Sequence, residues 1–309
     1  MKTMSAVTLR LNTWREAKVL AEELHGWTFR GQHDASWTLI STLQRAAQEG
    51  RKISVLLGGI EQQIIEDFKR RAHHFLPDPP PLEAEIDWMA LIQHFGGTTR
   101  LLDFTKSFYV AAFFAVERAS TECAIWCVNH YALILGLERF VGVDTLKSRM
   151  PHWEVLHRTA AYAQQVLKKE RGSFKRIVFE VQPFKLNERL AVQQGVFLCP
   201  LSVDVPFIDS LAATFGLQTA DIVNAPIEEF RPSGDFPKWF RDVAVIKLLL
   251  PRAIHHDVLR DLWDMNVNAA SLFPGLDGLA RSLNYHLYIS NLWDIKYDSG
   301  GFGISPAEP

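Results

Sequence analysis

Residues 98–128 contain the pattern that most restricts how this chain can fold. A turn and a short extended piece at 98–105 lead into a segment at 107–119 that is almost entirely apolar, and 123–128 then has the composition of a strand. A helix that is apolar on all sides belongs in the protein interior, because no face of it is suited to water. We therefore expect a buried helix at 107–119 that connects two strands of a sheet.

The rest of the chain alternates between helical and extended patterns. Apolar residues recur at intervals of three and four in four more segments, which predicts helices at 14–24, 53–73, 83–95 and 152–169. Runs rich in apolar, β-branched and aromatic residues predict strands at 27–31, 175–181, 193–198 and 243–250. Two helices are expected after the last strand. No repeat, low-complexity tract or Gly/Ser linker divides the chain, so the pattern favours a single α+β unit with insertions.

The composition limits the classes of function. The 309 residues carry 33 lysines and arginines against 35 aspartates and glutamates, a net charge of −2, so there is no overall basic field that would coat a polyanion. The longest apolar run, at 109–116, is far short of the roughly 20 residues that cross a bilayer, and the first residues lack the apolar core of a secretory signal. Three cysteines are too few for a disulfide framework and fit a reducing compartment. We therefore expect a cytoplasmic protein without a membrane partner.

Motifs for metal and nucleotide chemistry are weak. The histidine pairs at 73–74 and 255–256 lack the spacing of zinc ligands, because neighbouring side chains on a helix point apart. The cysteines at 123 and 127 lie in a predicted strand, where we expect both thiols to be packed. The glycine-containing turn at 96–100 lacks the ending of a P-loop, and the chain has no Gly-x-Ser-x-Gly elbow. We expect no metal site.

Polar residues nevertheless interrupt apolar surroundings at three places. These are Arg30-Gly31-Gln32, then Gln93-His94-Phe95-Gly96 with Arg100 and Asp103, then Arg189 with Gln193-Gln194-Gly195. A structural interpretation of each is available. Arg30 and Asp103 can form a buried ion pair, His94 can cap a helix end, and Gln194 can be a turn residue. The other interpretation is a binding cleft, in which such groups converge.

Two of these places carry motifs by which the chain resembles the FRG-domain family. The Phe-Arg-Gly signature of that family matches Phe29-Arg30-Gly31. Its second motif, Gln-His-aromatic-Gly followed by Thr-Arg-Leu-Leu-Asp-aromatic-Thr, matches 93–96 and 99–105. Further similarity extends to 272–279. The resemblance implies a lead-in at 1–14, an FRG domain at 15–285 with an insert or lid at 140–172, and a C-terminal extension at 286–309.

The order of the motifs is also similar to the arginine–serine–glutamate order of NAD-dependent ADP-ribosyltransferases. This second resemblance implies an ADP-ribosyltransferase-like split antiparallel sheet core with flanking helices and an inserted helical segment. It implies catalytic roles for Arg30, Asp103, Thr105 and Gln194, with Gln194 in place of the usual glutamate. It implies NAD as the substrate, bound by Arg30, Gly31, Gln32, His94, Arg100, Phe104 and Tyr109.

Three functions follow as alternatives. The first is an NAD-consuming enzyme, either an ADP-ribosyltransferase that modifies nucleic acid or protein or an NAD glycohydrolase, acting as a toxin or an anti-phage defence effector. The second is a non-catalytic module that binds a nucleotide or a nucleic acid on the same fold. The third is a structural protein in which Arg30, Arg100 and Asp103 form a core network, so that removal of Arg30 unfolds the chain.

Overall fold

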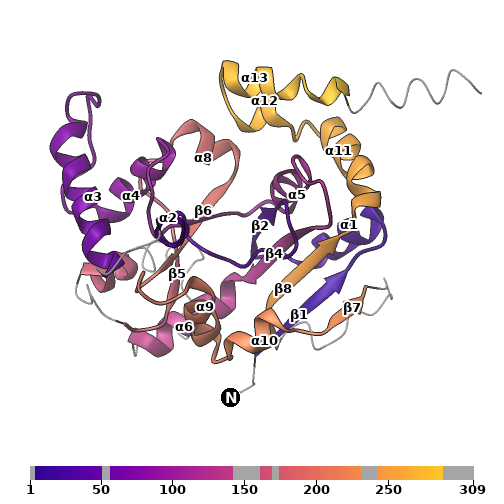
Figure 1. Ribbon diagram of the computed structural model, residues 1–309, viewed down its shortest axis with the longest axis horizontal. Coiled ribbons are helices and arrows are strands. Elements are labelled where there is room, and N and C mark those ends of the chain that lie inside the picture. Colours follow the sequence, from indigo (N-terminus) through magenta and orange to yellow (C-terminus); the bar gives the residue numbers. More distant parts are fainter. Residues whose placement is uncertain (1–3, 51–55, 142–160, 169–173, 231–241, 288–309) are drawn as a thin grey trace, which may run out of the picture.

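The structure, a computed structural model, describes residues 4–50, 56–141, 161–168, 174–230 and 242–287. The strands among these residues are β1 (Ser5–Arg10), β2 (Trp27–Gln32), β3 (Leu102–Thr105), β4 (Cys123–Asn129), β5 (Val178–Val181), β6 (Gly195–Pro200), β7 (Ile227–Glu229) and β8 (Val243–Leu250). They form one sheet in the order β5-β6-β3-β2-β4-β8-β1-β7 (Figure 1). The predicted α+β class is confirmed.

The sheet is nearly divided in its middle. β2 pairs with β4 along its whole length, from Trp27 to Gln32, but with β3 only at Phe29 opposite Thr105. Within the run β5-β6-β3-β2-β4-β8, each strand is antiparallel to its neighbour, as expected. β1, in contrast, runs parallel to both β8 and β7. β1 also lies within the stretch expected to be only a lead-in, so these residues contribute a strand to the sheet.

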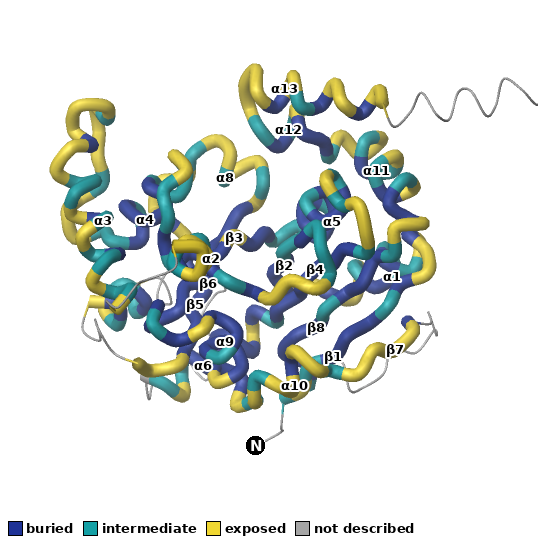
Figure 2. The backbone as a smooth tube through the Cα atoms, viewed as in Figure 1, coloured by how far each residue is buried: buried dark blue, intermediate teal, exposed yellow. Residues whose placement is uncertain are grey.

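Helices cover both faces of this sheet. They are α1 (Trp14–Glu23), α2 (Thr42–Glu49), α3 (Leu57–Ala72), α4 (Glu85–His94), α5 (Phe108–Val116), α6 (His130–Val141), α8 (Glu188–Val192), α9 (Phe207–Phe215), α10 (Thr219–Val223), α11 (His255–Asp264), α12 (Ala269–Leu272) and α13 (Leu276–Ser282). Alternate residues of β4 enter two different cores: Ile125 packs with α1, α5 and α11, and Trp126 packs with α6 and α9. A third core joins α3 and α4 to β5 and β6. Figure 2 shows the buried residues concentrated along the strands.

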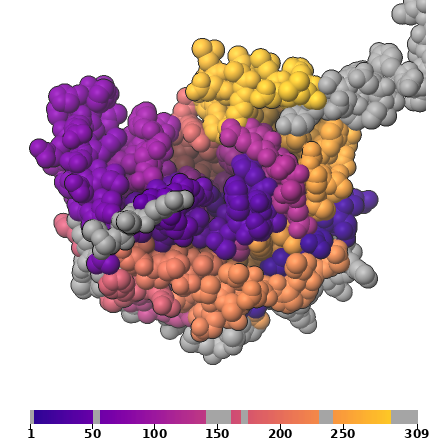
Figure 3. Space-filling view, viewed as in Figure 1, coloured from indigo at the N-terminus to yellow at the C-terminus, as the bar shows by residue number. Residues whose placement is uncertain are grey.

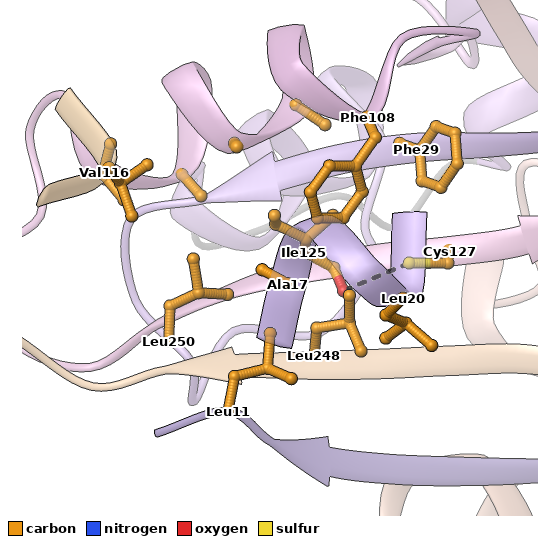
Figure 4. Packing of buried hydrophobic residues seen from close by; sticks show 14 of the residues in the cluster. Leu11, Ala17, Leu20, Phe29, Phe108, Val116, Ile125, Cys127, Leu248 and Leu250 are labelled. Carbon is orange, nitrogen blue, oxygen red and sulfur yellow. Dashed lines mark hydrogen bonds between the residues drawn. The ribbon is translucent and has the colours of Figure 1, made fainter. Parts of the chain in front are cut away.

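The helix expected at 107–119 is α5, and it is buried against the sheet. Ser107 caps its N-terminus by accepting a hydrogen bond from the Val110 N–H at 3.3 Å. A Cβ atom at Gly31 of β2 would lie 2.1 Å from the carbonyl oxygen of Ala111, so glycine is what permits this close contact of helix and strand. Figure 4 shows Phe108 of α5 packed in the core that includes Phe29. The glycine of the Phe-Arg-Gly signature therefore has a packing role.

Most elements predicted from periodicity are confirmed. The predicted helices at 14–24, 53–73 and 83–95 correspond to α1, α3 and α4, and the four predicted strands correspond to β2, β5, β6 and β8. At least three α-helices, α11, α12 and α13, follow β8 among the described residues, where two were expected. Of the helix predicted at 152–169, residues 161–168 are described and are helical. Most of the expected insert at 140–172 and of the extension at 286–309 lies outside the described residues. No helix in the described ranges combines the length and the apolar character needed to cross a membrane.

Candidate functional site

A cavity of about 300 Å³ opens where β2 and β3 stop pairing. Its walls come from β2, β3, β6, α4, α5 and α8, and the surface is hollowed below the yellow α12–α13 segment in Figure 3. The lining residues are Phe29, Arg30, Gly31, His33, Ala90, Gln93, His94, Asp103, Phe104, Thr105, Phe114, Asn187, Arg189, Leu190, Gln193 and Phe197. The structure thus brings together residues from all three polar places in the sequence.

Arg30 spans the gap between the two strands. Its Nη1 donates to the backbone carbonyl of Asp103 at 2.7 Å and lies 3.9 Å from the Asp103 carboxylate. The Nε of Arg30 is buried and has no hydrogen-bond partner among the described residues. Burial lowers the pKa of this guanidinium, the charge of Asp103 opposes that shift, and Arg45 adds to it. The arginine therefore holds the strands together and keeps donor capacity for a ligand.

Asp103 presents an oriented carboxylate at the cavity. Its side chain is 60% exposed, and Gln93 of α4 donates to Oδ1 from Nε2 at 2.8 Å. The amide oxygen of Gln93 in turn accepts from the hydroxyl of Thr99. Gln93 belongs to the Gln-His-aromatic-Gly motif but was not predicted as a site residue. In the structure, the hydrogen bond from Gln93 orients the Asp103 carboxylate.

Arg189 contributes a second guanidinium from α8. Its Cζ lies 4.6 Å from the centre of the Phe273 ring, and no hydrogen bond or ion pair to another described residue occupies it. Burial lowers the pKa of Arg189, and the charge of Asp103 opposes this shift. The sequence singled out Arg189 as a polar residue but gave it no role. It lines the cavity because Asn187, the N-cap of α8, turns the chain there.

Two neutral histidines complete the polar lining. Burial is the main cause that lowers the pKa of both His33 and His94 below 6.5, and for His94 the charge of Arg189 adds to it. The Nδ1 of His33 is buried without a partner among the described residues. At neutral pH both imidazoles therefore act as hydrogen-bonding groups rather than as cations.

The two remaining residues with implied catalytic roles differ from expectation. Thr105 lines the cavity, but its hydroxyl donates to the Gln193 carbonyl at 2.7 Å and accepts from the Ser107 N–H at 3.0 Å. Gln194 is not a lining residue. It adopts a φ of 49°, and its carbonyl accepts from the Lys106 N–H at 3.0 Å. Gln194 therefore behaves as the turn residue of the structural interpretation, and the expected glutamate position is not in the cavity.

Of the residues implied for NAD binding, Arg30, Gly31, His94 and Phe104 line the cavity, and Gln32, Arg100 and Tyr109 do not. The Gln32 amide is buried, where it donates to Thr38 and accepts from Trp126. Tyr109 packs edge-on against Trp14 of α1, with ring centres 6.3 Å apart. Both side chains serve the core.

Arg100 forms a buried ion pair instead of a phosphate contact. Its Nε donates to the Glu61 carboxylate at 2.7 Å, and its backbone N–H donates to the other oxygen at 2.8 Å. Nη1 donates to the Leu201 carbonyl at 2.6 Å. These bonds tie α3 to the start of β3 and to the chain after β6. Arg100 is therefore a structural residue of the second motif.

The described residues contain no cluster of three or more histidine, cysteine or acidic side chains that could hold a metal. The rings of His73 and His74, at the end of α3, lie with their centres 3.9 Å apart and their planes tilted by 41°, instead of pointing apart as expected. All three cysteines are free and buried, and burial raises the pKa of Cys123 and Cys199 to about 12.

Comparison with known proteins agrees with the motifs. No curated protein and no solved structure matches the chain. Residues 25–123 match the family model of the FRG domain. This range runs from β2 into β4 and includes Arg30, Gln93, His94 and Asp103, whereas Arg189 lies beyond it. The chain therefore carries an FRG domain at 25–123, as its Phe-Arg-Gly and Gln-His-Phe-Gly motifs predicted.

Proposed function

We propose that this protein is an NAD-consuming enzyme, an ADP-ribosyltransferase that modifies a nucleic acid or a protein, and that NAD binds in the cavity between β2 and β3. The observation that carries the proposal is the arrangement of Arg30 and Arg189 around the oriented carboxylate of Asp103. The cavity volume of about 300 Å³ is within the range of small-molecule sites.

The charges of the cavity suit an anionic ligand. Two guanidiniums face one carboxylate, and both histidines are neutral at pH 7, so the lining carries one net positive charge. Arginine binds phosphate with paired, charge-assisted hydrogen bonds, and the donors left free on Arg30 and Arg189 are available for this. The diphosphate of NAD meets that requirement.

Aromatic side chains supply a surface for the nicotinamide ring. Phe114 of α5 lines the cavity and is partly exposed, whereas the lining residues Phe29 and Phe104 are nearly fully buried. Phe95 of the second motif and Tyr109 are not lining residues. We assign the stacking role to Phe114, since an accessible ring face is required.

The reaction breaks the bond between nicotinamide and the ribose. Nicotinamide leaves with the bonding electron pair, and positive charge develops on the ribose ring. A carboxylate placed beside that ring stabilises the charge, and Asp103 is the sole acidic side chain that lines the cavity within the described residues. The acceptor, or water, then forms the new bond to the ribose carbon and loses its proton. In this proposal Asp103 takes the role that the resemblance gave to Gln194.

The proposal includes an ADP-ribosyltransferase-like split sheet. Its support is the single residue pair between β2 and β3, which separates β5-β6-β3 from β2-β4-β8-β1-β7. It also includes a cytoplasmic role as a toxin or anti-phage defence effector. Three free, buried cysteines support a reducing compartment.

Nicotinamide release measures this function directly. Purified protein is incubated with NAD, with and without cell extract or nucleic acid, and nicotinamide is followed by chromatography. We expect release that falls at least about 100-fold in Arg30→Gln and is unchanged in Arg260→Gln, a control at an exposed position of α11. A requirement for extract or nucleic acid identifies a transferase, and release without either identifies a glycohydrolase.

One observation favours the second function, a non-catalytic nucleotide-binding module. Gln194, which the resemblance places at the catalytic glutamate, is outside the cavity. Binding of NAD without nicotinamide release in any of these conditions would support that module and contradict the enzyme.

A further inference from the structure

We propose that the C-terminal α12–α13 segment completes the ligand site, because Phe273 holds Arg189 in place as a second phosphate-binding arginine, so that the site takes a diphosphate rather than a single phosphate. This inference rests on the proposed function for the identity of the ligand. It adds a subsite made by residues beyond the matched range 25–123.

Arg189 has the properties of a ligand-binding side chain. It lines the cavity, its guanidinium lies against the Phe273 ring, and its side chain has no hydrogen bond or ion pair with another described residue. A structural arginine in this protein looks different: Arg100 makes hydrogen bonds with Glu61 and with backbone carbonyls. The stack leaves the N–H donors at the edge of the Arg189 guanidinium free for an anion.

Phe273 is itself held by two further side chains. Arg281 of α13 lies over the same ring, with its Cζ 4.2 Å from the ring centre, and is ion-paired with Glu117 at the end of α5. Phe114 packs edge-on against Phe273, with ring centres 5.9 Å apart. These contacts determine where Arg189 lies, since the ring that carries it cannot shift alone.

α12 is also tied directly to the cavity wall. Gln193, a lining residue, donates from Nε2 to the Leu272 carbonyl at 2.8 Å. A Cβ atom at Gly278 would lie 1.8 Å from the Phe273 carbonyl oxygen, so glycine lets α13 fold back tightly onto α12. In Figure 1 this segment lies above α8 and α5, and α12 contacts α8. The segment therefore packs as part of the site.

Two phosphates account for the placement of the two arginines. Asp103 and Arg45 are the charges that shift the pKa of Arg30, and Asp103 and Arg281 are those that shift the pKa of Arg189. Arg30 on β2 and Arg189 on α8 line the same cavity from different elements, and the charge of Asp103 acts on both guanidiniums. A diphosphate offers an anionic group to each of these two arginines, whereas a single phosphate offers only one.

Calorimetric titration with ADP-ribose and with AMP tests this subsite without requiring turnover. Arg30→Gln is expected to weaken both ligands by at least about tenfold, because each loses a charge-assisted hydrogen bond. Arg189→Gln is expected to weaken ADP-ribose to a similar extent and to leave AMP within about twofold. Phe273→Leu is expected to reproduce the Arg189→Gln pattern, and Phe273→Tyr, which keeps a ring under the guanidinium, to restore ADP-ribose binding. Arg260→Gln is the matched control.

Each outcome decides for or against the subsite. Wild-type affinity for ADP-ribose in Arg189→Gln, or an equal loss for AMP and ADP-ribose, overturns it. Failure of the wild type to bind ADP-ribose also overturns it. The melting temperature of Phe273→Leu shows whether this variant is folded. If the folded variant binds ADP-ribose normally, Phe273 does not position Arg189 for the ligand. Nicotinamide release is measured separately, so loss of catalysis with intact ADP-ribose discrimination contradicts only the proposed function.

Discussion

The Arg30 guanidinium donates to the backbone carbonyl of Asp103 across the place where β2 and β3 stop pairing. In a regular antiparallel pair such a carbonyl accepts from a backbone N–H of the neighbouring strand. Here a side chain of the Phe-Arg-Gly signature takes over that bond, which allows the strands to separate and the cavity to form. The same residue is thus part of the fold and of the site.

Disruption of the ion pair of Arg100 is expected to lower the free energy of unfolding more than disruption of the ion pair of Arg30. Glu61→Gln leaves the buried Arg100 without its counter-charge and should lower the free energy of unfolding by about 3–5 kcal/mol. Arg30→Gln, whose acidic neighbour is exposed, should lower it by at most about 2 kcal/mol. Urea denaturation followed by circular dichroism measures both. Equal losses would support the structural protein of the third alternative.

The glycine of the signature is expected to matter for stability. Gly31→Ala places a methyl group against the backbone of Ala111 and Ala115 in α5, which should cost about 1–3 kcal/mol. Gly59→Ala in α3 is the matched control, since nothing lies within 4 Å of its Cβ position and alanine favours a helix. The same denaturation experiment compares the two variants. Unaltered stability of Gly31→Ala would show that α5 does not lie so close to β2.

Glu180 is expected to make unfolding sensitive to acid. Burial raises the pKa of Glu180, but a hydrogen bond with His130 at 2.8 Å and the ion pair with Lys106 outweigh this and hold the pKa below 4.5. Its folded-state pKa is depressed, so the ionised group contributes stability above pH 4.5 that is lost as the pH falls through the folded-state pKa. The urea midpoint of the wild type should fall more steeply below pH 4.5 than that of Glu180→Gln. Equal slopes would contradict this.

His94 is expected to take up a proton when an anionic ligand binds. Burial and the charge of Arg189 lower the pKa of His94 in the free protein, and a bound diphosphate would raise it. The complex then binds more protons than the free protein, so affinity for ADP-ribose should rise as the pH falls from 8 to 6. Calorimetry in two buffers of different ionisation enthalpy measures the uptake. His94→Asn should abolish this uptake, and unchanged uptake in that variant would exclude His94 as its source.

Local patterns predicted much of the fold. The apolar segment before β4 identified α5, and the run ended by Pro251 identified β8, because burial on all sides leaves a plain signal in composition. β1 was not predicted. It pairs with β8, which is distant in the chain, so no turn signal beside β1 marks it as a strand. The parallel pairing of β1 depends on those distant partners and is not encoded locally.

The candidate site was predicted in part, for a related reason. Arg30, His94 and Asp103 lie in motifs and do line the cavity. Arg100 lies in the same motif and does not, because its partner Glu61 is on α3 and that contact cannot be read from spacing. The contact between Arg189 and Phe273 could not be read from the sequence either, because it requires α12 to pack beside α8.

The central claim is that Asp103 supports the cleavage of NAD in this cavity, and the initial rate of nicotinamide release by wild type and Asp103→Asn tests it most directly. Asparagine keeps the size of the side chain and removes its charge. We predict nicotinamide release by the wild type and a rate at least about 100-fold lower in Asp103→Asn, with ADP-ribose still bound. Absence of release by the wild type, or an equal rate in the variant, would contradict the account.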